Sequence, residues 1–127
     1  RMFSILVVVD DFADDVSVSR HSAILWGLFT RGRHANITTL VSTQSYKALH
    51  PIIRKNLSAL MVWRQKSQQE LDSILDEVSA IYSKKIMLQM YKMVTDTPFN
   101  FLYINLAAPD KQNMFYSGFK QKLIPRG

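Results

Sequence analysis

Residues 5–11 have the sequence ILVVVDD, an aliphatic, largely β-branched run that ends in two carboxylates. Extended by Phe3 and Ser4, the apolar run has strand length, and its nearly continuous hydrophobicity is typical of a strand covered on both faces of a parallel sheet. We therefore expect a strand over residues 3–9. It would deliver Asp10 and Asp11 to the crevice where the carboxyl ends of parallel strands bind ligands.

Strands and helices alternate through the first half of the sequence. The pattern predicts, after the first strand, a helix over 19–31, a strand over 37–43, a helix over 51–55 and a strand over 59–63. Gly32 stands where a helix C-terminal cap belongs. Alternation of this kind indicates right-handed crossovers and a parallel sheet flanked by helices, and thus the α/β fold class.

The second half of the sequence is more helical. Ser67 and Glu70 have the spacing of a capping box, and apolar residues from Leu71 to Ile81 follow at helical spacing. A further helix is expected over 84–94, and the alternation over 99–106 predicts a fourth strand.

The bulk composition is that of a globular domain. The chain has 127 residues, of which 47% are hydrophobic and 20% charged, so we expect a single domain over residues 1–127. Without cysteine it has no disulfide or thiolate metal site, and no apolar run has the length of a membrane span. The net charge of +6 favours a polyanionic partner such as nucleic acid. Because Arg1 and Met2 lead directly into a strand, we interpret the chain as a piece of a longer protein.

Three polar residues at strand ends are candidates for phosphate chemistry. Asp10 suits a Mg²⁺ site, and Asp11 suits a group that orients or deprotonates an attacking water. The amide of Gln44, directly after the second strand, suits hydrogen bonding to a γ-phosphate or a water. Solvated acids at the start of a loop, and a merely polar Gln44, explain the same pattern without function.

Arg31, Gly32, Arg33 and His34 form a basic cluster between the first helix and the second strand. A guanidinium on a tight turn is suited to stabilising charge on a neighbouring subunit's nucleotide. Favourable interaction of basic side chains with the carboxyl end of the helix is the structural alternative.

Three segments, LVVVDD, TRGRHANITTLVSTQSY and LHPIIRKN, together resemble the poxvirus-like genome-packaging ATPases of large DNA viruses. That family belongs to the FtsK–HerA division of P-loop motors. The resemblance covers residues 3–64 well and weakens through residue 106. It implies a partial RecA/ASCE-type parallel sheet that starts at the Walker B strand.

The resemblance also implies roles, ligands and partners. Asp10 would hold Mg²⁺, Asp11 would be the catalytic base, Gln44 the sensor, and Arg33 the arginine finger, with Arg31 as the alternative. ATP and Mg²⁺ would be bound by the complete protein. The implied partners are double-stranded DNA, further copies in a homo-oligomeric ring, and a capsid portal or membrane-associated vertex, in the virion or at a cytoplasmic viral assembly site.

The sequence departs from the family pattern in one large respect. It contains no G-x-x-x-x-G-K-[ST] loop, which supplies the backbone N–H groups that cradle the phosphates. We therefore expect no ATP hydrolysis by this chain alone. The alternative functions are a non-enzymatic DNA-binding or scaffolding module derived from such an ATPase, and a Mg²⁺-dependent nuclease that uses Asp10, Asp11, Asp14 and Asp15. The nuclease needs acids at further strand ends, whereas Asp72, Asp76 and Glu77 fall in an expected helix.

Overall fold

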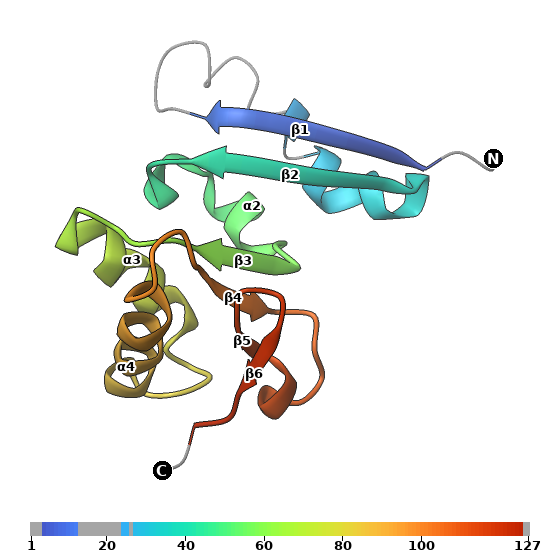
Figure 1. Ribbon diagram of the computed structural model, residues 1–127. Helices are drawn as coiled ribbons and strands as arrows, with labels where there is room; N and C mark the ends of the chain where they lie inside the picture. Colours follow the sequence, from blue (N-terminus) through green and yellow to red (C-terminus); the bar gives the residue numbers. More distant parts are fainter. Residues whose placement is uncertain (1–3, 13–23, 26, 126–127) are drawn as a thin grey trace. The chain divides into compact units, whose positions relative to one another are not determined.

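The computed structural model describes residues 4–12, 24–25 and 27–125, with the side chains of Asp11, Phe12 and Arg33 outside the description (Figure 1). The chain divides into two compact units, Arg1–Leu57 and Ser58–Gly127, which are described separately below. The prediction of one domain over residues 1–127 stays a prediction.

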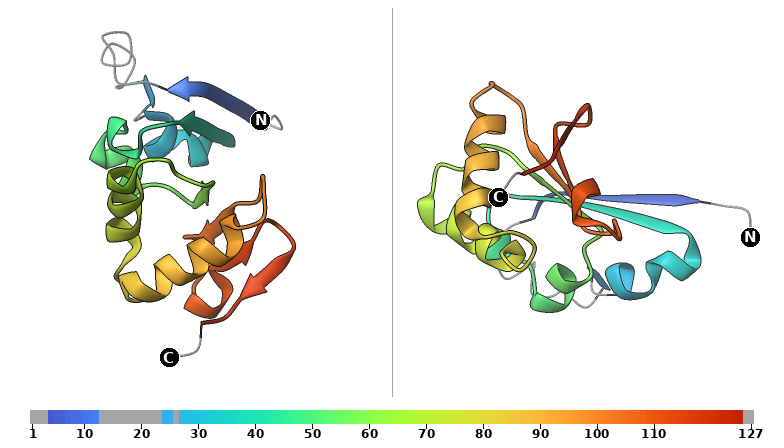
Figure 2. Two further views of the ribbon diagram at one scale, coloured as in Figure 1. Left: turned by 60° about the vertical axis from the view of Figure 1, so that its left-hand side comes forward. Right: turned by 90° about the horizontal axis from the view of Figure 1, so that it is seen from below.

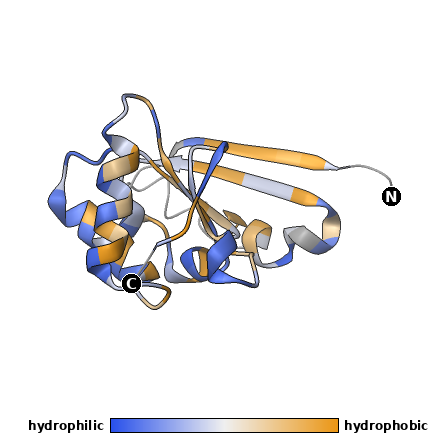
Figure 3. Ribbon diagram, turned by 60° about the horizontal axis from the view of Figure 1, so that its bottom comes forward, coloured by the Kyte–Doolittle hydropathy of each residue, from blue (hydrophilic) through white to orange (hydrophobic). Residues whose placement is uncertain are grey.

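The first unit contains a parallel pair of strands. β1 (Ile5–Phe12) pairs with β2 (Ile37–Thr43), starting from Ile5 opposite Ile37. Figure 3 shows β1 as apolar along most of its length, as expected for a strand with this sequence. The parallel pairing predicted for these two segments is confirmed, and β1 continues through both aspartates rather than ending before them.

The helix expected over 19–31 is confirmed at its described residues, with 19–23 and 26 outside the description, whereas the expected glycine cap is not found. Residues 24–25 and 27–31 are helical, and a 3₁₀ turn, η1 (Gly32–Ala35), continues directly from them. Among the described residues of this connection, the left-handed backbone conformation falls on Asn36, with φ of 58°, and not on Gly32. The expectation of a Gly32 cap was therefore wrong, because the 3₁₀ turn postpones the reversal of the chain to Asn36. Asparagine tolerates that conformation better than most residues do.

Two short helical segments follow β2. η2 (Tyr46–Ala48) leads to α2 (Pro51–Lys55), whose bounds are those expected from the sequence. His50 caps α2, since its Nδ1 accepts a hydrogen bond from the Ile52 N–H at 3.1 Å. The described buried apolar side chains of this unit are Leu25, Tyr46, Leu49 and Ile53.

The second unit is built on an antiparallel sheet in the order β3-β4-β5-β6. Its strands are β3 (Ala59–Val62), β4 (Leu102–Asn105), β5 (Phe115–Ser117) and β6 (Gln121–Leu123), with the 3₁₀ turn η3 (Lys111–Asn113) before β5. The α/β class is confirmed, but β3 pairs antiparallel with β4, so the expected parallel arrangement is described for β1 and β2 only. Two helices separate β3 from β4. The first helix leads the chain away from the end of β3, and the second helix returns it to the same end of the sheet. β4 therefore runs in the direction opposite to β3.

Those two helices are α3 (Gln68–Val78) and α4 (Lys84–Thr95). Each begins at a serine whose hydroxyl accepts a backbone N–H: Ser67 from Glu70 at 3.3 Å and Ser83 from Ile86 at 3.4 Å. The first of these bonds is half of the predicted capping box. Figure 2 shows α4 running beside the strands of its unit.

One face of the antiparallel sheet supplies most of this unit's core. Alternate residues of the strands are buried, among them Val62, Leu102, Ile104, Phe115 and Leu123. Both helices contribute a buried apolar stripe, which consists of Leu71, Ile74, Leu75, Val78, Met87, Met90, Tyr91 and Val94. Helical and strand periodicity thus direct their apolar residues into one shared core.

Two phenylalanines provide a matched test of this assignment. Phe115 is 0% exposed and Phe119 is 69% exposed. We expect Phe115→Ala to lower the free energy of unfolding by about 3–5 kcal/mol, because it removes a fully buried ring. Phe119→Ala should lower it by no more than about 1.5 kcal/mol, the range for aromatic contacts. Urea denaturation followed by circular dichroism measures both, and equal losses would contradict the assignment of the two faces.

Candidate functional site

The carboxyl ends of β1 and β2 bring three of the predicted residues to one edge of the parallel pair. Asp10 and Asp11 are two of the last three residues of β1, and Gln44 follows directly after β2. Parallel strands place their carboxyl ends at the same edge, and the pairing of Phe12 with Thr43 fixes that arrangement here. The side chains of Asp10 and Gln44 are both exposed there, and the side chain of Asp11 lies outside the described residues.

The two aspartates occupy an irregularity in the strand pairing. Val9 pairs with Val41 and Phe12 pairs with Thr43, so two residues of β1 stand opposite the single residue Ser42 of β2. This arrangement is that of a β-bulge, which bends the strand locally and redirects side chains. Bulges are over-represented next to active sites. The sequence run carries no signal for this bulge, and the simple strand expected there would have pointed consecutive residues to opposite faces.

A side-chain turn fixes the chain around Gln44. The Thr43 hydroxyl donates to the Ser45 carbonyl at 3.0 Å and accepts from the Ser45 N–H at 3.1 Å. Threonine and serine favour turns of this kind because their hydroxyls satisfy nearby backbone groups. The buried ring of Tyr46 then anchors the following residues. Gln44 is therefore an exposed amide held between the turn at Thr43 and the buried ring of Tyr46.

Arg54 stabilises the segment that follows Gln44, a role that sequence reasoning did not assign. Its Nε donates to the Leu49 carbonyl at 3.1 Å, and its guanidinium carbon lies 5.6 Å from the centre of the Tyr46 ring. Asn56, the other member of the Arg-x-Asn pattern, donates from Nδ2 to the Ile52 carbonyl at 2.7 Å. Both residues hold the η2–α2 segment together from within.

The structure places the backbone of the two predicted arginines at the other end of the pair. Arg31 ends the helical residues, and Arg33 lies in η1, shortly before β2 begins. β2 has seven residues and rises by about 3.3 Å per residue, so its ends are about 20 Å apart. Figure 1 shows η1 and the arrowhead of β2 at opposite ends of the strand.

Arg31 folds back along its own helix. A Cβ atom added at Gly27 would lie 2.9 Å from Nη2 of Arg31, so the glycine leaves room for the guanidinium. The Arg33 side chain lies outside the described residues. The structure therefore brings Asp10, Asp11 and Gln44 to one edge and does not bring Arg31 or the Arg33 backbone to it.

The donor set at this edge suits magnesium. Mg²⁺ takes one or two carboxylates and completes its octahedron with waters and substrate phosphates, and Asp10 offers an exposed carboxylate at a strand end. Across the described residues, no group of three or more His, Cys, Asp or Glu side chains could hold a metal ion. Within the same part of the chain, no helix combines the length and apolarity needed to cross a membrane.

The nuclease hypothesis needs further acids at strand ends, and its Asp14 and Asp15 lie outside the described residues. Asp72 and Asp76 belong to α3, and Lys84 forms ion pairs with them at 3.4 and 3.1 Å. The hydrogen bond to Asp76 is the main cause that raises the pKa of Lys84 above its usual value. These carboxylates therefore join the start of α4 to α3 and lie at no strand end.

The second unit also contains an open cavity of about 470 Å³ between the end of β3, α3 and α4. Its lining residues are Arg64, Gln65, Gln68, Leu71, Tyr91, Lys92, Thr95 and Asp96. The Tyr91 hydroxyl accepts from the Gln65 N–H at 2.7 Å, and the Thr95 hydroxyl donates to the Tyr91 carbonyl at 2.7 Å. None of the predicted site residues lines this cavity, and its charges are of both signs.

Comparison with known proteins identifies one family. The model of the family described as Poxvirus A32 protein matches residues 1–107, a stretch that includes β1, β2 and all five predicted site residues. No curated protein and no solved structure matches the chain. The match agrees with the resemblance to poxvirus-like packaging ATPases. Because it covers more than half of the sequence, the chain belongs to the Poxvirus A32 protein family.

Proposed function

We propose that this chain is the C-terminal portion of an ATP-driven motor of the FtsK–HerA division that packages double-stranded viral DNA into capsids. The main support for this proposal is that the bulged Asp10–Asp11 pair and Gln44 lie together at the carboxyl ends of β1 and β2. Family membership over residues 1–107 supports the same reading at a coarser level. A carboxylate pair beside an amide at the carboxyl end of a parallel sheet suits phosphoryl transfer from a nucleotide to water.

Each residue of the edge has a role in this proposal. Asp10 holds Mg²⁺, directly or through water, and the ion supplies charge neutralisation at the phosphates when bound. Asp11 accepts a hydrogen bond or a proton from the attacking water. Gln44 donates its amide N–H to a γ-phosphate oxygen or orients that water, without adding charge. The turn at Thr43 and the contacts of Arg54 position Gln44 for this task.

Arg33 acts in this proposal on the nucleotide of a neighbouring subunit, with Arg31 as the alternative. The separation of about 20 Å between the ends of β2 favours action between subunits, because η1 and the carboxyl edge belong to opposite ends of one strand. A ring of identical subunits would supply the basic end of one copy to the acidic edge of the next.

The phosphate-binding loop is absent from the sequence, so we propose that a preceding part of the parent protein supplies it. The complete motor would bind ATP and Mg²⁺, encircle duplex DNA as a homo-oligomeric ring, and engage a capsid portal or membrane-associated vertex. It would act in the virion or at a cytoplasmic viral assembly site. The net charge of +6 is compatible with a polyanionic partner.

Asp11→Asn, made in a parent protein that contains a phosphate loop, should preserve nucleotide binding and abolish turnover. The substitution keeps the size of the side chain and removes its ability to accept a proton. Phosphate release under ATP saturation measures turnover, and calorimetry measures binding. Asp110→Asn, at an exposed acid before η3, is the matched control. Wild-type turnover by Asp11→Asn would remove Asp11 from the reaction.

Gln44→Ala in the same parent should slow hydrolysis more than it weakens nucleotide binding, because the amide acts near the γ-phosphate. We expect a loss of about tenfold to a thousandfold in kcat, the range for one positioned hydrogen-bond donor. Gln112→Ala, an exposed glutamine in η3, should leave both quantities unchanged. An equal loss in the two variants would show a general effect of glutamine removal instead.

Arg33→Ala distinguishes action between subunits from helix capping. Loss of an arginine finger costs on the order of a thousandfold or more in kcat, whereas loss of a capping interaction costs about 0.3–1 kcal/mol of stability. Subunits with Arg33→Ala should regain activity when mixed with subunits that lack the phosphate loop, because some interfaces then combine an intact loop with an intact arginine. Arg31→Ala is measured in parallel. Failure of mixing to restore hydrolysis in assembled rings contradicts action by Arg33 between subunits.

A further inference from the structure

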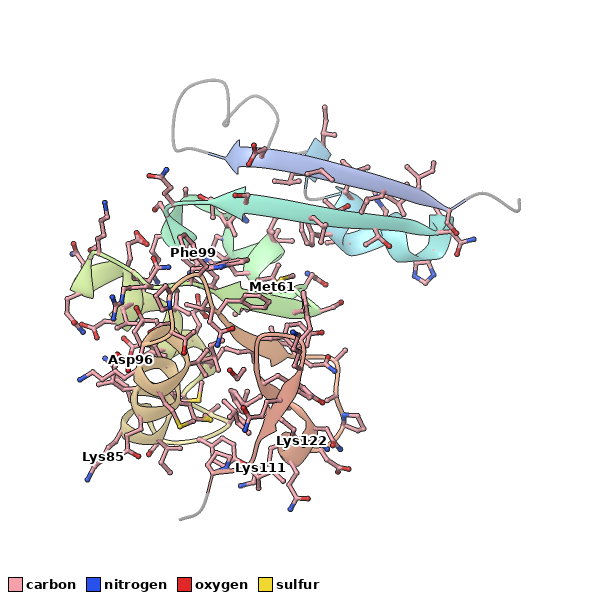
Figure 4. The ribbon with its side chains drawn as sticks, in the orientation of Figure 1. Met61, Lys85, Asp96, Phe99, Lys111 and Lys122 are labelled. Carbon is pink, nitrogen blue, oxygen red and sulfur yellow. The ribbon has the colours of Figure 1, made fainter. Side chains whose placement is uncertain are left out.

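The antiparallel sheet of the second unit has a second face, opposite its core. Residues that pair directly across antiparallel strands project to the same side, and successive residues alternate between sides. Met61 pairs with Tyr103, Tyr103 with Tyr116, and Tyr116 with Lys122. This row crosses all four strands, and the alternating core residues Val62, Leu102 and Phe115 lie on the other side. Figure 4 labels Met61 and Lys122 at the β3 and β6 edges.

A second row of residues continues this face beyond the strand ends. Trp63 follows β3, Phe101 precedes β4, and the Gly118 N–H donates to the Phe101 carbonyl at 2.8 Å. Gly118 has φ of 58° and brings Phe119 next to Phe101. A Cβ atom at position 118 would lie 3.0 Å from Oδ1 of Asn100, so this turn requires glycine.

The rings of this face form a continuous array. Ring centroids are 4.7 Å apart for Trp63 and Phe101, and 4.9 Å for Phe101 and Phe119. The array continues from Phe119 to Tyr103 at 5.4 Å and from Tyr103 to Tyr116 at 5.5 Å. These separations are those of favourable aromatic pairs, so the rings hold one another in place. We call these five residues, Trp63, Phe101, Tyr103, Tyr116 and Phe119, the aromatic face.

The aromatic face remains accessible to solvent in spite of these contacts. Trp63 is 46% exposed and Phe119 is 69% exposed, while neighbouring Met61 is 36% exposed. A contiguous exposed apolar surface on a folded protein commonly marks a binding site. Aromatic side chains are well suited to binding, because they present a large rigid surface with few rotatable bonds.

The charges around the aromatic face favour a polyanion. Lys122 pairs with Tyr116 in the strand register, and Lys120 lies in the adjoining turn. The four strands contain no aspartate or glutamate. Lys122 also donates to Oδ1 of Asn113 at 2.6 Å, a neutral partner that leaves its charge uncompensated. A sheet that displays rings inside a basic margin combines the two elements of single-strand recognition, stacking and phosphate contact.

We propose that the aromatic face binds single-stranded nucleic acid. Unpaired bases stack on the exposed rings of Trp63 and Phe119, and Lys120 and Lys122 contact the phosphates. A base pair within a duplex hides its flat surface between its neighbours, so this face selects unpaired bases over duplex. The proposal goes beyond the motor function proposed above. It requires neither ATP nor the edge of β1 and β2, and the two proposals therefore succeed or fail separately.

Fluorescence anisotropy with the purified chain tests this proposal through three probes of equal length. The probes are labelled oligo(dT), an abasic oligomer with the same phosphates, and a duplex, all at one fixed salt concentration because phosphate contacts depend on salt. We expect the tightest binding to oligo(dT), since only this probe offers unpaired bases. Equal affinity for oligo(dT) and the abasic oligomer overturns the stacking proposal, as does a preference for the duplex.

Variants of Phe119 test whether binding of oligo(dT) requires an aromatic ring at this position or only an apolar side chain. We expect Phe119→Leu to weaken oligo(dT) binding by about fivefold to a hundredfold, the range for loss of one base stack. Phe119→Tyr keeps the ring and should bind as the natural protein does. Met93→Ala, at a 60% exposed position of α4, is the control for removal of exposed apolar surface. Equal binding by Phe119→Leu and Phe119→Tyr overturns the proposal.

Two lysine variants with the same net charge as each other test the basic margin. Lys122→Ala and Lys85→Ala each remove one positive charge, but Lys85 extends outward from α4 (Figure 4). Lys122→Ala should weaken oligo(dT) binding several-fold and Lys85→Ala should have a smaller effect. Sedimentation of the same samples detects association between copies. A dimer that Phe119→Leu dissociates, without binding of oligo(dT), assigns the aromatic face to self-association and overturns the proposal.

Discussion

Parallel pairing of β1 with β2 is the constraint on which the arrangement of the chemistry depends. Two parallel strands end at the same edge, so Asp10, Asp11 and Gln44 are brought together although more than thirty residues separate them in sequence. The same pairing requires the chain to return to the opposite end before β2 begins, and Arg31 and Arg33 lie in that return. The separation of acids from arginines therefore follows from topology, and a site that uses both is naturally completed between two subunits.

Elements with strong local signals could be predicted from the sequence. The bounds of β2 and α2 are those expected, since a β-branched run and a proline in the first helical turn are unambiguous. The Ser67 cap with apolar spacing likewise located α3, and apolar spacing alone located α4. β5 and β6 have three residues each, too few to establish a period, and they form because β4 offers them an edge.

The sequence predicted which residues lie at the candidate site, but it did not predict the local backbone geometry that holds them. Strand ends placed Asp10 and Gln44, but the bulge arises from pairing between strands, which no local pattern of residues encodes. The same limit applies to Arg54, whose partners Leu49 and Tyr46 are defined by the turn that it stabilises. Gly32 was expected to cap the helix because it is a glycine at the expected helix end. The 3₁₀ turn that follows places the left-handed backbone conformation at Asn36 instead.

The two units differ in how their apolar strands are covered. In the second unit α3 and α4 cover one face of the sheet, and its central residues Leu102, Ile104 and Phe115 are 0% exposed. In the first unit β1 is the more apolar strand, but Ile5, Leu6 and Val8 are 50%, 60% and 62% exposed. Parallel strands are normally stable only when both faces are covered. Cover supplied by other protein surface would thus stabilise the same strands that hold Asp10 and Asp11, so assembly and formation of the site would be energetically coupled.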